Sequence, residues 1–209
     1  MQTNKHRLAY MVELAVLLAI LLMLEITGLG MFKTFGLELT ILQIPVILGA
    51  IILGPAAGAI LGGAFGLLSF WECFGKSEFG ATLLGINPVL TFVVCVPTRI
   101  LMGWLCGLIF KAMDRKLAGT KGDFASYLVA SLAGALLNTL LFMSALCLCF
   151  YHTDYIQAVS SALGAANVFM FVVLLVGVQG LVEAALSTVV GAGVGKGVRH
   201  ALRHSTPRE

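Results

Sequence analysis

Residues 87–104 read NPVLTFVVCVPTRILMGW, an apolar stretch with one proline and one arginine near its middle. Asn87 suits the N-cap of a helix, and Pro88 suits its first position. Pro97 lacks an amide hydrogen, so we expect the helix to bend there. Arg99 lies roughly 16 Å from the start of this helix at about 1.5 Å per residue. The stretch therefore predicts a kinked membrane-spanning helix that carries a deeply placed positive charge.

A guanidinium at that depth needs a partner. It costs about 2.5–3.5 kcal/mol on insertion scales, so Arg99 must face protein or water rather than lipid. Two interpretations remain open. Either Arg99 forms a structural ion pair, for which Glu183 is the best candidate, or it binds an anion at the floor of a ligand pocket.

The composition is that of a membrane protein. Of the 209 residues, 59% are hydrophobic and 11% are charged, and the mean hydropathy is +1.01. A soluble domain carries about 25% charged residues. No hydrophilic stretch is long enough to fold alone, so we predict one all-α integral membrane domain over residues 1–209. The five cysteines show no metal-ligand spacing and no CxxC motif, which predicts neither a disulfide framework nor a metal site.

The apolar runs predict six transmembrane helices. Their expected ranges are 8–26, 40–53, 56–71, 88–113, 124–150 and 167–194. The second and third form a short hairpin around the turn at Gly54 and Pro55. In the third, Gly58, Gly62 and Gly66 recur at four-residue spacing, which predicts a flat face packed closely against another helix. The segments predicted as outward-facing loops are 27–39, 72–86 and 151–166.

Six crossings place both termini on one side of the membrane. Ten of the 13 Lys and Arg residues then lie on that side: Lys5, Arg7, Lys111, Arg115, Lys116, Lys121, Lys196, Arg199, Arg203 and Arg208. Only Lys33 and Lys76 lie on the other. Since short cytoplasmic segments collect Lys and Arg, we predict that both termini are cytoplasmic.

Polar residues fall at one depth on three successive helices. Arg99, Asn138 and Gln179 each lie roughly 16–18 Å below the predicted outer surface. Glu183 is one turn deeper on the same face as Gln179. Such a group is typical of a ligand site near the membrane midplane. The alternative is a polar network that only locks these helices together.

No motif for covalent or energising chemistry is visible. The segment 190–197 (VGAGVGKG) imitates a phosphate-binding loop but lacks the first glycine and the final Ser or Thr. Ser69 has no histidine in any membrane segment to activate it. We therefore predict a binding protein that is not an enzyme and has no cofactor in this chain.

Three stretches carry a resemblance to a known family. Residues 40–70, the segment VPTRILMG at 96–103 and the segment LNTL at 137–140 resemble the substrate-binding S components of energy-coupling factor (ECF) vitamin transporters. The six-helix plan and the Ala15/Ala19 pair on the first helix fit the same family. The pattern is most similar to members assigned to pantothenate, in which the matching positions are Arg99 and Asn138.

The resemblance implies a multi-pass protein of a prokaryotic cell membrane that captures a vitamin from outside. A separate transmembrane T component and two ATPase subunits, which consume ATP, would drive release of the vitamin. Small residues on the first helix, here Ala15 and Ala19, would dock the T component. Lipid surrounds the chain, and no nucleic acid is involved.

The predicted substrate-binding residues are Arg99, Asn138, Gln179, Trp71, Asn87, Gln43 and Glu183. Trp71 and the segment 72–86 are expected to close over the ligand. The alternatives are an S component for another water-soluble vitamin or precursor, such as riboflavin, folate or a queuosine precursor, and a stand-alone secondary carrier. An inverted repeat would favour the carrier, and none is visible. An intramembrane enzyme would need a nucleophile–base pair, which the sequence does not show.

Overall fold

The computed structural model describes residues 2–34, 37–117 and 123–205. The chain begins with α1 (Gln2–Ile26) and an antiparallel hairpin of β1 (Met31–Thr34) and β2 (Leu37–Thr40), in which Met31 pairs with Thr40. The remaining helices are α2 (Gln43–Ile52), α3 (Pro55–Glu72), α4 (Glu78–Ile86), α5 (Pro88–Leu117), α6 (Asp123–Phe150), α7 (Asp154–Ala162) and α8 (Val168–Ser205).

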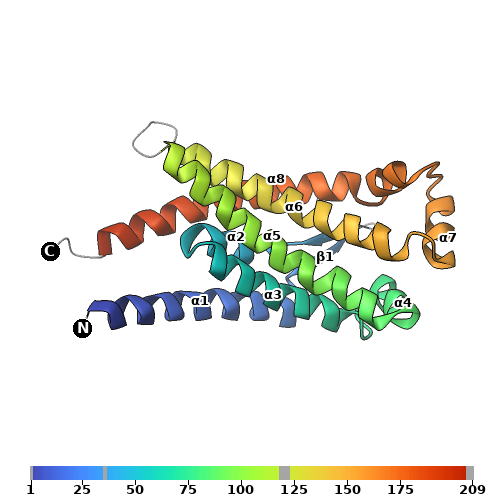
Figure 1. Ribbon diagram of the computed structural model, residues 1–209, viewed down its shortest axis with the longest axis horizontal. Helices are drawn as coiled ribbons and strands as arrows, with labels where there is room; N and C mark the ends of the chain where they lie inside the picture. The colour runs from blue at the N-terminus through green and yellow to red at the C-terminus, as the bar shows by residue number, and fades with distance from the viewer. Residues whose placement is uncertain (1, 35–36, 118–122, 206–209) are drawn as a thin grey trace.

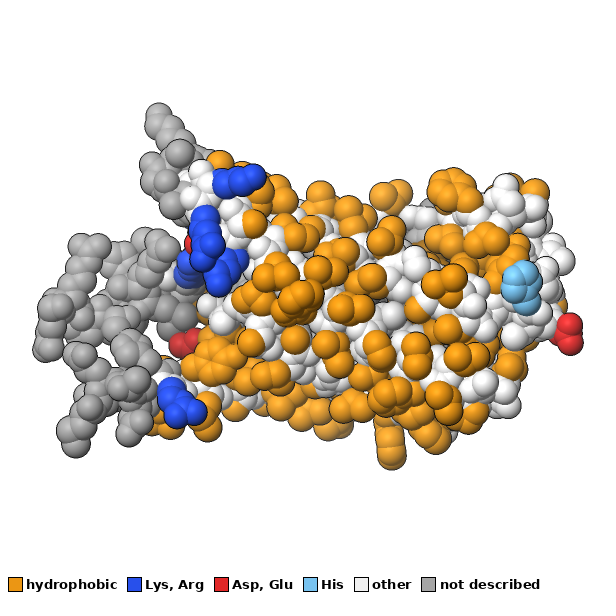
Figure 2. Space-filling model, viewed as in Figure 1, with side chains coloured by type: hydrophobic (Ala, Val, Ile, Leu, Met, Phe, Trp, Pro, Cys, Tyr) orange, Lys and Arg blue, Asp and Glu red, His pale blue; other side chains and the backbone are white. Residues whose placement is uncertain are grey.

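The long helices run along one axis of the molecule, and the two ends differ in charge. The start of α1, the end of α5, the start of α6 and the end of α8 lie at one end, whereas α4 and α7 lie at the other (Figure 1). Hydrophobic side chains cover the middle of the visible face, and Lys and Arg gather near the end that holds the termini (Figure 2). Lys121 and Arg208, two of the basic residues used to predict the orientation, lie outside the described residues.

Within the described residues, four helices have the length and apolar character needed to cross a membrane. Their apolar spans are Arg7–Ile26, Pro88–Leu117, Phe124–Phe150 and Gln179–Arg199. At ten residues, α2 extends only about 15 Å, half of a bilayer core of about 30 Å. The predicted second helix is thus shorter than expected, because residue 40 belongs to β2 and the helix begins at Gln43. The prediction of six membrane-spanning helices is confirmed only in part.

All three predicted outer loops contain regular structure. The segment 27–39 holds most of the β-hairpin, 72–86 holds α4 and 151–166 holds α7. The two short helices begin at capping side chains: Ser77 Oγ accepts from Gly80 N at 3.1 Å, and Thr153 Oγ1 accepts from Ile156 N at 3.5 Å. A Ser or Thr followed by an acidic residue is a helix-start signal, and it is present at both places.

The α3–α5 contact sets the position of the pocket. A side chain added at Gly58 would collide with the backbone of Gly103, and one added at Gly62 would collide with the backbone carbonyl of Arg99. At Gly66, an added Cβ would lie 2.7 Å from Val96 Cα. The predicted glycine face is therefore confirmed, and α5 is the helix that it contacts. Because the backbones approach this closely, α3 fixes the height of Arg99 along α5.

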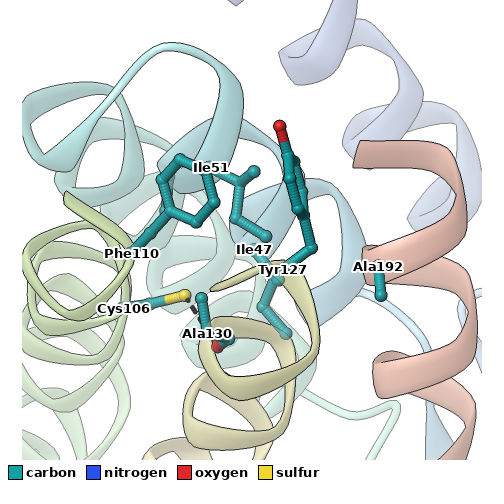
Figure 3. Close-up of a cluster of buried hydrophobic side chains, with 8 residues drawn as sticks. Ile47, Ile51, Cys106, Phe110, Tyr127, Ala130 and Ala192 are labelled. Atoms are coloured by element: carbon teal, nitrogen blue, oxygen red, sulfur yellow. Dashed lines mark hydrogen bonds between the residues drawn. The ribbon is translucent and has the colours of Figure 1, made fainter. Parts of the chain in front are cut away.

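A buried apolar cluster closes the half of the bundle near the termini. It joins α2, α5, α6 and α8 through Ile47, Ala50, Ile51, Cys106, Phe110, Tyr127, Ala130 and Ala192. Figure 3 shows these side chains converging between the helices, with Cys106 Sγ donating to the carbonyl of Ala130 at 3.4 Å. The five cysteines are all free thiols. This half of the bundle is thus held together by apolar packing across four helices.

Candidate functional site

A cavity of about 380 Å³ lies in the half of the bundle opposite the termini. Residues of β2, α3, α4, α5, α6 and α8 line it. Its volume falls within the range of small-molecule sites, which is about 300–1,000 Å³. The wall is mostly apolar, and its polar residues include Thr40, Glu72, Arg99, Asn138, Gln179 and Glu183.

Arg99 is the main cation of this cavity. The residue is 8% exposed, and its side chain is held by weak contacts, since Nη1 lies 3.3 Å from the carbonyl of Val94 and 3.4 Å from Thr98 Oγ1. The guanidinium carbon lies 4.4 Å from the ring centre of Phe142 and 5.1 Å from that of Phe65. Nε is buried and has no hydrogen-bond partner. The group is therefore positioned by aromatic rings, and its donors are only partly satisfied.

The ion pair between Arg99 and Glu183 is not formed. Glu183 Oε1 instead accepts from the backbone N–H of Thr40 at 2.8 Å and from Gln179 Nε2 at 3.3 Å. Among the described residues, no carboxylate forms a salt bridge with Arg99. The prediction that Glu183 is the ion-pair partner of Arg99 is thus wrong. The β-hairpin explains this result, because Thr40 reaches the carboxylate that the sequence had assigned to Arg99.

The polar residues that the sequence placed at one depth do line the same cavity. Arg99, Asn138, Gln179 and Glu183 come from α5, α6 and α8, and all four line the same cavity. Asn138 and Glu183 are buried residues, 8% and 6% exposed. Their assignment to substrate binding stays a prediction, but they form one site.

Three other predicted residues lie away from the cavity. Gln43 is fully buried and donates through Nε2 to Ser187 Oγ at 2.9 Å, so it joins α2 to α8. Asn87 caps α5 as expected, with Oδ1 accepting from Val89 N and Leu90 N at 3.1 Å. Trp71 is 68% exposed and does not line the cavity. None of these three side chains is part of the pocket wall.

Sequence reasoning missed other residues of the wall. Glu72, at the end of α3, is 7% exposed and lines the cavity, as does Thr40 of β2. Phe79 and Leu83 of α4 also contribute, so the segment 72–86 does shape the pocket. An acidic residue that directly follows an apolar helix was the one available signal for Glu72.

Ala15 and Ala19 lie on the surface of α1. Both are exposed, and they share the outward side of the helix with large apolar residues such as Met11 and Val12, which are 61% and 53% exposed. The opposite side of α1 packs on the bundle through Leu21 and its neighbours. The Ala15/Ala19 strip is therefore free for an external contact, and its assignment to a T component stays a prediction.

Comparison with known proteins agrees with this geometry. The model of the family "ECF transporter, substrate-specific component" matches residues 9–194. The pantothenate transporter PanT of Leuconostoc mesenteroides is 33% identical over 106 residues, which make up 50% of this chain and 48% of that protein, so the match spans about half of this relative. The pantothenic acid transporter PanT of Lactococcus lactis is 28% identical over 174 residues, which make up 78% of this chain and 84% of that protein. The chain belongs to the family of substrate-specific components of ECF transporters.

Proposed function

We propose that the chain is the membrane-embedded binding subunit of an ECF-type importer that captures pantothenate from outside the cell. In this proposal six segments cross the cell membrane, both termini are cytoplasmic and the cavity opens outward. The charge difference between the two ends of the molecule supports this orientation. The names of the two PanT relatives support pantothenate as the substrate.

Arg99 is the main reason for proposing an anionic substrate. A buried guanidinium with an unpartnered Nε and no salt-bridged carboxylate in the described part of the chain is an incomplete site. A ligand carboxylate would complete it by charge-assisted hydrogen bonds, which are about twice as strong as neutral ones. The rings of Phe65 and Phe142 hold the guanidinium in place before the ligand arrives.

The other polar groups suit the rest of the molecule. Pantothenate carries one amide and two hydroxyl groups besides its carboxylate. Asn138 offers both a donor and an acceptor, and Gln179 is already oriented by its hydrogen bond to Glu183. The apolar lining, including Leu83 and Met143, would contact the dimethyl part of the substrate and exclude water.

Release would depend on partner subunits. We infer that a T component docks on the Ala15/Ala19 strip of α1 and that two ATPase subunits use ATP to drive the transport cycle. The exposure of this strip supports the docking surface. In this proposal the chain itself binds the vitamin and carries out no covalent chemistry.

Calorimetry across a panel of vitamins tests the substrate. Purified protein should bind pantothenate, and riboflavin, folate and neutral vitamins should bind far more weakly or not at all. Arg99→Ala should reduce pantothenate affinity by about 2–5 kcal/mol, which is roughly 30-fold to 5,000-fold. Trp71→Ala is the matched control and should bind normally, because Trp71 lies outside the cavity. Binding of a neutral vitamin that persists in Arg99→Ala would overturn the proposal.

A further inference from the structure

A carboxylate of α8 holds the end of the β-hairpin. Glu183 is 6% exposed, and its Oε1 accepts from the backbone N–H of Thr40 at 2.8 Å. Thr40 is the last residue of β2, and alternate residues of an antiparallel pair direct their N–H groups away from the partner strand. A backbone N–H that is withdrawn from water needs an acceptor. Glu183 supplies that acceptor from the other end of the sequence.

A second contact of the same kind lies one turn further along α8. Ser187 Oγ accepts from Gln43 Nε2 at 2.9 Å, three residues after Thr40. Glu183 and Ser187 are four residues apart, so they lie on the same face of the helix. This face therefore holds both the end of β2 and the start of α2. Of the two α8 residues, Glu183 lines the cavity and Ser187 does not.

Glu183 also orients a neighbour in the cavity wall. Its Oε1 accepts from Gln179 Nε2 at 3.3 Å, one turn earlier on α8. Thr40 and Gln179 both line the cavity. One oxygen atom thus fixes two parts of the wall, one from β2 and one from α8. An acceptor that serves protein donors does not need a negative charge, since the carbonyl oxygen of an amide accepts in the same way.

We propose that Glu183 is a positioning residue that fastens the β-hairpin as one wall of the cavity and does not itself bind the ligand. With Glu183 in place, Thr40 and the amide of Gln179 keep fixed positions. Without it, the end of β2 loses its attachment to this face of α8 next to the cavity. This inference rests on the proposed function, because it assigns Glu183 a role toward an anionic substrate that Arg99 binds.

The variants Glu183→Gln and Glu183→Ala separate positioning from direct contact. Glutamine keeps an oxygen that accepts from Thr40 and removes a negative charge from the cavity. Pantothenate should therefore bind at least as tightly as to the wild type, and up to about tenfold more tightly. Alanine removes the acceptor, and affinity should fall on the order of tenfold. If Glu183→Gln binds pantothenate more weakly than the wild type in calorimetry, the carboxylate itself contacts the ligand and the inference is overturned.

Hydrogen exchange of the unliganded protein gives a second readout. Peptides that contain the Thr40 amide should exchange slowly in the wild type and in Glu183→Gln, and on the order of tenfold faster in Glu183→Ala. Ser187→Ala is the matched control, because it removes the neighbouring contact on the same face of α8 and leaves the Thr40 amide bound. Fast exchange at Thr40 in the wild type would overturn the inference even if no variant folds. Equally slow exchange in Glu183→Ala would also overturn it.

The two measurements distinguish this inference from the proposed function. A protein in which Glu183 protects the Thr40 amide, but which binds no vitamin of the panel, would contradict the proposed function and leave the hairpin attachment in place. Normal pantothenate binding in Glu183→Ala would overturn the inference and leave the proposed function standing.

Discussion

At the scale of single residues, Arg99 is tolerated in the bundle because aromatic rings replace a counter-ion. Two phenylalanine rings and the Val94 carbonyl surround the guanidinium, and no salt-bridged carboxylate accompanies it in the described residues. Cation–π contacts of this kind stabilise a desolvated cation by about 2 kcal/mol or more. They hold the group without consuming its ability to bind an anion, as a carboxylate partner would.

Arg99→Lys should therefore bind pantothenate at an affinity between those of wild type and Arg99→Ala. Lysine keeps the positive charge but loses the planar fork that binds a carboxylate by two hydrogen bonds, so we expect at least roughly a tenfold loss. Calorimetry on the three proteins measures the order. If Arg99→Lys binds pantothenate as weakly as Arg99→Ala does, stacking of the guanidinium on the rings, and not its charge, accounts for the affinity that Arg99 contributes.

At the scale of elements, the α3–α5 interface decides where Arg99 lies. Gly62 and Gly63 are neighbours on α3, but a side chain at Gly62 meets the Arg99 carbonyl, whereas one at Gly63 meets Ile100 Cγ1 at an ordinary 3.5 Å. This pair offers a matched test of the interface, because the two changes have the same chemistry and differ in what they contact.

Gly62→Ala should destabilise the protein by about 1–3 kcal/mol, the usual cost of overpacking, and should weaken pantothenate binding. Gly63→Ala should be neutral or slightly stabilising, since alanine favours a helix by up to about 1 kcal/mol over glycine. Thermal unfolding and calorimetry on both variants measure this difference. Equal effects of the two changes would mean that the interface does not set the site.

At the scale of the whole molecule, charge separates the two ends. Lys116 is exposed near the end of α5, on the same side as the termini, and Asp154 is exposed at the start of α7 on the other side. Residue 118, another possible marker of the first side, lies outside the described residues. Cys73 is only 5% exposed and is therefore a poor reporter of the outer face.

An impermeant thiol reagent added to intact cells should label Asp154→Cys and should not label Lys116→Cys beyond the level of the parent protein. The Lys and Arg residues near the termini favour the cytoplasmic side, which places α7 outside. Opening the membrane should make Lys116→Cys reactive and serves as the control. The reverse labelling pattern would invert the orientation and would turn the cavity toward the cytoplasm.

The proposed docking of a T component on the Ala15/Ala19 strip also concerns the whole molecule. Ala15→Trp and Ala19→Trp should block uptake while pantothenate still binds to the purified protein, because a bulky side chain keeps two helices apart without reaching the cavity. Ile20→Trp is the control, since Ile20 is 39% exposed and lies off the Ala15/Ala19 strip. Uptake by cells and calorimetry give the two readouts. Loss of binding in Ala15→Trp would contradict a surface role.

The sequence by itself determined the membrane class, most of the helices and the family. These follow from local properties: apolar length, the spacing of glycines in α3, and capping residues such as Asn87. It also placed Arg99, Asn138 and Gln179 in one cavity, because depth along a helix depends only on residue count once the ends are known. A charged residue inside an apolar segment, such as Arg99, predicts a buried polar site from the sequence alone.

Only the tertiary structure decided which polar groups meet. The sequence suggested Arg99 as the partner of Glu183, but the β-hairpin brings the N–H of Thr40 to Glu183 and leaves Arg99 facing the cavity. Gln43 and Trp71 have residue types that suit a site, but the rotation of their helices turns Gln43 toward Ser187 and Trp71 toward the surface. Glu72 enters the wall because α3 ends beside the cavity, next to residues of α4 and α5. Such contacts depend on how distant elements pack, and no local pattern encodes them.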